Sequence, residues 1–145
     1  MISDTVSVHV RADEAVVFAY ISDRAKMDRW SFGTWHNILH NDGILEGRSM
    51  ATGAAVFLRI DADPARMIVD YHLGTSPDAL SPRIFARVMS GDVIGETPDS
   101  AVLLLTGLRS TDMDDERWNR LRRGHAAELD IIKGQIESGH NPRGE

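Results

Sequence analysis

Apolar residues in the C-terminal part of the chain recur at the spacing of one face of an α-helix. Over residues 114–138, at about 100° per residue, one stripe holds Trp118, Leu121, His125, Leu129, Ile132 and Ile136. The opposite side holds Arg117, Arg120, Arg123, Ala127 and Asp130. This pattern predicts an amphipathic helix of about seven turns.

Capping signals mark both ends of this helix. Thr111 or Asp112 is the expected N-cap, because such side chains accept hydrogen bonds from the free N–H groups of the first turn. Gly139 is expected to end the helix in a left-handed conformation. We interpret the charged residues of the helix as a solvated face: Glu116, Arg120, Arg122, Arg123, Glu128 and Asp130.

Upstream of this helix, apolar and polar residues alternate as they do in half-buried strands. Val6, Val8 and Val10 form the inward face of a first strand. Asp13 then caps a predicted helix that runs through Ile21, and a second short helix or turn covers 22–29. Further strands are predicted at 34–40, 44–52, 55–61, 66–73, 84–89 and 101–108.

Tight-turn signals separate most of these strands, so neighbouring strands are expected to pair antiparallel. Residues 41–43 (Asn-Asp-Gly) and 61–64 (Asp-Ala-Asp-Pro) are typical of reversals, and 74–82 reads as a longer loop. The order predicts an α+β fold in which a curved antiparallel sheet of about six or seven strands wraps around the long C-terminal helix. A curved sheet of this kind leaves a cavity between itself and the helix.

The length, net charge and cysteine content of the chain exclude some classes of protein. A length of 145 residues predicts one domain, 1–145. A net charge of −6 argues against a nucleic-acid binder, and the absence of cysteine excludes disulfides and thiolate metal sites. No signal peptide or membrane span is apparent, so we expect a soluble cytoplasmic protein with no membrane insertion. The sequence is compatible with either a monomer or a homodimer.

His125 is the candidate residue for chemistry because it interrupts an otherwise apolar stripe. Burial there disfavours the charged form, leaving a neutral imidazole that can both donate and accept hydrogen bonds. Such a group could contact a ligand or act as a general acid/base. It could also be a core histidine that is bonded to a backbone carbonyl or to Tyr71.

Aromatic and aliphatic residues near this histidine are the expected walls of a binding cavity. Trp30, Phe32 and Trp35 form either a lid over the cavity or a secondary hydrophobic cluster. Arg87 enters the cavity only if Phe85, Arg87 and Met89 form the inner face of their strand. The full set of expected ligand-binding residues is Trp30, Phe32, Trp35, Leu58, Tyr71, Arg87, Val88, Leu104, Trp118, His125 and Leu129.

No metal or cofactor site is expected. His36 and His40 have the i, i+4 spacing of a zinc-binding helix, but on a strand this spacing separates the side chains by about 13 Å. Asp61 and Asp63 read as turn residues because the rest of a calcium loop is missing.

The opening of the chain resembles that of a known superfamily. Residues 6–8 (Val-Ser-Val) precede an apolar-spaced helix over 12–23 that ends in Asp, and Trp30 follows. This arrangement, with the closing helix over 118–136, resembles the SRPBCC or START-like helix-grip superfamily. That superfamily includes START lipid-transfer domains, Bet v 1-like proteins and bacterial polyketide cyclase/dehydrase proteins.

The resemblance implies a helix-grip fold with a ligand cavity, but it does not select a reaction, because members include carriers and enzymes. The leading hypothesis is binding or transport of a hydrophobic small molecule such as a lipid. The alternative is a cofactor-free polyketide cyclase or dehydratase in which His125 moves protons. A third hypothesis is an interaction module whose groove takes a partner segment.

Overall fold

The computed structural model describes residues 1–141 and contains seven strands, three α-helices and two short 3₁₀ helices among them. The strands are β1 (Ser3–Val10), β2 (Trp35–Leu39), β3 (Leu45–Arg48), β4 (Ala55–Asp63), β5 (Ile68–Gly74), β6 (Ser81–Ser90) and β7 (Ala101–Leu108). The helices are α1 (Glu14–Ser22), η1 (Arg24–Lys26), α2 (Met27–Trp30), η2 (Gly91–Ile94) and α3 (Asp115–Ser138).

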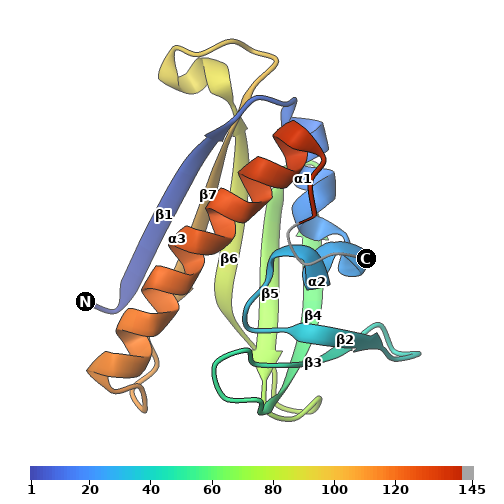
Figure 1. The fold of residues 1–145 in the computed structure, drawn as a ribbon, viewed down its shortest axis with the longest axis vertical. Helices are drawn as coiled ribbons and strands as arrows, with labels where there is room; N and C mark the ends of the chain where they lie inside the picture. The colour runs from blue at the N-terminus through green and yellow to red at the C-terminus, as the bar shows by residue number, and fades with distance from the viewer. Residues whose placement is uncertain (142–145) are drawn as a thin grey trace.

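All seven strands belong to one antiparallel sheet with the order β1-β7-β6-β5-β4-β3-β2. The first strand therefore pairs with the last one, with Val8 opposite Leu103. Figure 1 shows α3 running diagonally across one face of the sheet, with α1 and α2 beside its C-terminal half. The predicted helix-grip architecture, with two short helical segments after the first strand, is confirmed.

Alternating burial along β7 shows which face of the sheet the helix covers. Ala101, Leu103 and Leu105 are buried, whereas the residues between them are only partly buried. Strand β6 follows the same rule, with Ala86 and Val88 buried and Arg87 exposed. Because successive side chains on a strand point to opposite faces, the buried set faces the core and Arg87 faces away from it.

Helix α3 begins and ends through two local interactions. The Asp114 side chain accepts a 2.8 Å hydrogen bond from the backbone N–H of Arg117, and Gly139 ends the helix with φ 73°. The expected N-cap at Thr111 or Asp112 is wrong. Asp114 stands immediately before the first helical residue, which is the position from which a short side chain reaches the third N–H of the helix.

Two polar bridges attach α3 to the α1–α2 segment. The Tyr20 hydroxyl donates a hydrogen bond to the side-chain carbonyl of Gln135, and the Gln135 amide donates to the Arg29 carbonyl over 2.7 Å. The Tyr71 hydroxyl donates to the Ile21 carbonyl, also over 2.7 Å. Buried polar groups of this kind are tolerated because they are hydrogen-bonded, and here they hold the helix, the N-terminal segment and the sheet in one arrangement.

Element boundaries differ from the predicted ones by a few residues. The predicted loop over 74–82 is shorter, because β6 begins at Ser81, and β4 continues to Asp63 before the chain turns. The second predicted helix is divided into η1 and α2. Among residues 1–141, none of the helices has the length and apolar character needed to span a membrane.

Candidate ligand-binding site

A small, mostly apolar cavity lies where α3, the sheet and the residue 31–34 loop meet. Its volume is about 110 Å³. The apolar lining comes from Met27, Trp30, Phe32, Leu58, Tyr71, Leu73, Ile84, Leu105 and Leu121. Ser31, Thr34, His125 and Glu128 add polar atoms, and Gly33 and Gly124 complete the lining. We call this space the inner cavity.

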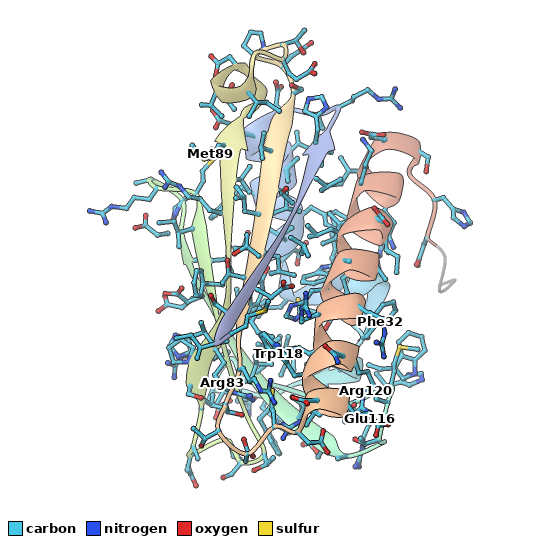
Figure 2. All side chains as sticks on the ribbon, turned by 90° about the vertical axis from the view of Figure 1, so that its left-hand side faces the viewer. Phe32, Arg83, Met89, Glu116, Trp118 and Arg120 are labelled. Carbon is cyan, nitrogen blue, oxygen red and sulfur yellow. The ribbon has the colours of Figure 1, made fainter. Side chains whose placement is uncertain are left out.

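A larger cleft adjoins the inner cavity at the end of the molecule where α3 begins. Its volume is about 700 Å³. Phe32, Gly33, Leu73, Ile84 and Leu121 line both spaces, so these residues form the boundary between them. Figure 2 shows Phe32 beside the lower half of α3, next to this boundary. We call the larger space the outer cleft.

His125 lies on the face of α3 that covers β7, and its side chain lines the inner cavity. It is 5% exposed. A Cβ atom placed on Gly107 would lie only 2.7 Å from Cε1 of the imidazole, so the glycine on β7 provides the space for the ring. Within residues 1–141, neither ring nitrogen of His125 has a hydrogen-bond partner. Tyr71, the expected partner, donates its hydroxyl hydrogen bond to the Ile21 carbonyl instead.

Burial sets the charge state of this histidine. Loss of hydration lowers the pKa of His125 to about 4, and the negative charge of Asp4 opposes that shift only in part. The imidazole is therefore neutral near pH 7. A neutral imidazole has one donor and one acceptor nitrogen, and here neither is occupied by the described protein atoms.

Glu128 is a site residue that the sequence interpretation missed. The charge pattern of the helix predicts that Glu128 lies on the solvated face, but its side chain is only 6% exposed and lines the inner cavity. One carboxylate oxygen accepts a 2.9 Å hydrogen bond from the backbone N–H of Phe32. The helical spacing carries a signal that could have found it, because Glu128 lies three residues after His125 and seven after Leu121, on the same face.

The loop of residues 31–34, which Glu128 contacts through the Phe32 N–H group, also forms hydrogen bonds on its other side. The Phe32 carbonyl accepts a 2.9 Å hydrogen bond from the backbone N–H of Met50, and the Thr34 hydroxyl donates to the Ser31 hydroxyl over 2.8 Å. The wall formed by residues 31–34 is thus attached to α3 through Glu128 and to the β3–β4 turn through Met50. These contacts position Phe32 between the inner cavity and the outer cleft.

The structure brings some of the predicted lining residues together at the cavity and places the others elsewhere. Trp30, Phe32, Leu58, Tyr71 and His125 line the inner cavity. Two predicted residues lie on the outer face of the sheet and are corrected here: Arg87 is exposed, and Leu104 lies opposite Arg87. In place of Leu104, its neighbour Leu105 lines the cavity.

Four further predicted residues line neither the inner cavity nor the outer cleft. Val88, Trp118 and Leu129 are buried in the core, and Figure 2 shows Trp118 in the layer between the sheet and α3. Trp35 is half-buried and packs edge-on against His36, with ring centroids 4.5 Å apart. Trp35 therefore does not complete an aromatic lid with Trp30 and Phe32.

Gly124 is a glycine in the interior of α3 that helps to form the inner cavity. It lines the inner cavity, and a Cβ atom at this position would have only Phe32 Cδ2 near it, at 3.9 Å. Glycine is unfavourable in a helix interior, so the residue keeps the cavity open rather than helping the helix to form.

Outside the cavity, one group of side chains has the composition of a metal site. Asp61, Asp70 and His72 have candidate ligand atoms within 4.8 Å of one another. They lie on β4 and β5, and Asp61 is largely exposed. His40 instead pairs with Glu46 at 2.9 Å. We assign no metal function to these residues.

No protein-family profile and no curated protein sequence matches the chain. Solved structures do resemble it. Zhui aromatase/cyclase from Streptomyces sp. R1128 superposes with a TM-score of 0.72 at 16% identity, covering 99% of this chain and 98% of that one. A START superfamily protein from Mycobacterium smegmatis gives 0.67 at 14% identity, covering 97% and 100%. The Aha1 dimer from Colwellia psychrerythraea gives 0.68 at 14% identity, covering 96% and 98%.

These similarities define the fold. The sheet order, the long closing helix and nearly full-length coverage of both chains give this protein a START-like, helix-grip fold. Proteins with this fold include an aromatase/cyclase and a START superfamily protein. A fold shared by such different proteins does not select one activity, so function has to be argued from the cavity.

Proposed function

We propose that this protein binds a hydrophobic small molecule between the sheet and α3. The observation that carries this proposal is the inner cavity, which is largely apolar and adjoins the larger outer cleft. Ligand sites are typically concave, mostly apolar and provided with a few polar groups. His125 and Glu128 are such groups.

The sizes of the two spaces restrict how a ligand would lie. A dry cavity of about 150 Å³ is known to accept benzene, so the inner cavity at about 110 Å³ has room for only a small apolar group. Typical small-molecule sites measure about 300–1,000 Å³, and the outer cleft falls in that range. The ligand would therefore place one apolar end beside His125 and the remainder in the outer cleft.

A neutral fluorescent probe, N-phenyl-1-naphthylamine, tests this function. We expect saturable binding of one probe per chain, with increased emission as the probe leaves water. The His125→Ala variant should change the affinity only modestly, by about threefold to tenfold, because one hydrogen bond contributes about 1 kcal/mol. Fluorescence titration measures both effects. His40→Ala, which alters a surface histidine away from both spaces, is the matched control.

Absence of saturable probe binding would contradict the proposal. Purified protein examined by native mass spectrometry gives an independent check, because a bound small molecule would add to the mass of the chain. If neither the probe nor any small molecule binds, the hypothesis of a groove for a partner segment gains support.

A second candidate function is that of a cofactor-free cyclase or dehydratase. The observation that favours it is the neutral, unpartnered imidazole of His125, which lines the inner cavity together with the buried side chain of Glu128. General acid/base catalysis requires a titratable side chain within reach of the substrate. Enclosure of the substrate in the cavity would also orient a reactive chain and exclude water. This candidate requires turnover of a polyketide-like substrate, lost in His125→Ala while N-phenyl-1-naphthylamine still binds.

A further inference from the structure

The outer cleft is positively charged although the protein as a whole is acidic. Its lining contains the three arginines Arg83, Arg117 and Arg120, and a single carboxylate, that of Asp112. The net charge of the whole chain is −6. This local excess of positive charge is not expected from the composition of the chain. Because the cleft adjoins the apolar inner cavity, the positive charge lies where a ligand would extend out of that cavity.

Only one of the three arginines is neutralised within the cleft. Arg117 lies 3.5 Å from a carboxylate oxygen of Asp112, and that carboxylate also accepts a hydrogen bond from the Ser110 hydroxyl. Among residues 1–141, neither the Arg83 nor the Arg120 side chain has a hydrogen bond or an ion pair. The pair Arg117–Asp112 therefore contributes no net charge, and two guanidinium groups are left over.

These two groups come from opposite walls of the cleft. Arg83 belongs to β6 and is partly buried, while Arg120 belongs to α3 and is exposed. The pairing of β6 with β5 shifts in register before Ile84, so the alternation that turns Arg87 away from α3 does not extend to Arg83, which lines the cleft. Figure 2 shows Arg83 on the sheet side and Arg120 on the helix side of the same end of the molecule. A ligand that extends from the inner cavity into the cleft would pass between them.

The acidic residues at the start of α3 do not cancel these charges. Asp114 caps the helix, and Asp115 pairs with Arg109 at 2.8 Å. Glu116, one turn before Arg120, is exposed and does not line the cleft. No carboxylate of the described residues lies within 4.0 Å of the Arg83 or Arg120 guanidinium.

We propose that the ligand is an amphiphile with an anionic head group, carboxylate or phosphate, held between Arg83 and Arg120 in the outer cleft. This inference rests on the proposed function, because the apolar end of the same molecule occupies the inner cavity. A guanidinium group can bind either a carboxylate or a phosphate head group, because its N–H donors can bind two oxygen atoms at once. The charges also define the orientation of the ligand, with the head outward and the tail toward His125.

Competition against the neutral probe tests the head group separately from cavity binding. Dodecanoic acid, dodecyl phosphate and dodecanol share one tail and differ only in the head. We expect at least one of the two anions to displace N-phenyl-1-naphthylamine at about one-tenth of the dodecanol concentration. In the double variant Arg83→Gln/Arg120→Gln this advantage should fall below about twofold. Raising the salt concentration should also reduce it, because partly exposed charges are screened.

Arg123→Gln is the matched control, since it removes the same charge from an exposed position on α3 that lines neither space. It should keep the full advantage of the anions, and circular dichroism should show that every variant is folded. Equal displacement by acid, phosphate and alcohol would overturn the inference, as would an advantage that persists in the double variant. Failure of the neutral probe to bind at all would instead overturn the proposed function.

Discussion

Replacing Gly124 with leucine is expected to reduce the affinity for a cavity ligand by about tenfold to 100-fold while the protein stays folded. The added side chain would enter the space that Gly124 leaves open beside Phe32, where a Cβ atom has its first neighbour at 3.9 Å. A ligand could then bind only by displacing packed atoms, which costs about 1–3 kcal/mol or more. Stability should not decrease, because glycine in a helix interior is about 1 kcal/mol less favourable than alanine.

The same helix offers a matched control for this substitution. Gly134 is exposed on α3, and a Cβ atom there would meet nothing within 4 Å. Gly134→Leu should therefore keep wild-type binding in the N-phenyl-1-naphthylamine titration, and urea denaturation compares the stability of both variants with wild type. Wild-type affinity in Gly124→Leu would show that the ligand does not use the inner cavity, and unfolding of that variant would show that the space is filled.

Acidification is expected to destabilise the folded protein through His125. The pKa of this group is about 4 in the folded protein and about 6.5 in an unfolded chain. As the pH falls from 7 to 4.5, the unfolded chain binds a proton at this position that the folded protein does not bind. The free energy of unfolding should therefore decrease by about 2–3 kcal/mol over this range.

The His125→Gln variant isolates this contribution, because glutamine does not titrate. Urea denaturation of wild type and variant at pH 7 and pH 4.5 should show that wild type loses about 2–3 kcal/mol more than the variant does. The lowered pKa values of Asp112 and Glu137 also make stability depend on acid, but both proteins share these carboxylates. An equal loss in both proteins would mean that the imidazole titrates as if it were in water.

The architecture could be read from the sequence because it depends on periodic patterns. The stripe on α3 and the alternation in β1 each place apolar residues on one face, and short turns between strands favour antiparallel pairing. Residues 101–105 of β7 are all apolar, so the pattern does not show which face is inward. The choice of Leu104 rather than Leu105 as a cavity residue follows from that ambiguity.

The polar parts of the site depend on contacts between distant segments. The buried Glu128 carboxylate accepts a hydrogen bond from the Phe32 N–H group, which is 96 positions away in sequence. Gly107 matters because the His125 ring approaches its backbone closely. No local pattern around either residue reveals its partner. The excess charge of Arg83 and Arg120 likewise becomes visible only when β6 and α3 are placed at one cleft.

We infer that a ligand enters the space beside His125, and the ring signals of the six histidines report on that space. NMR spectra of histidine-labelled protein, recorded as N-phenyl-1-naphthylamine is added, should show His125 shifting until one probe is bound per chain. His40, which lines a separate surface recess, should not shift. Unchanged His125 signals at probe saturation would show that the probe does not enter this space.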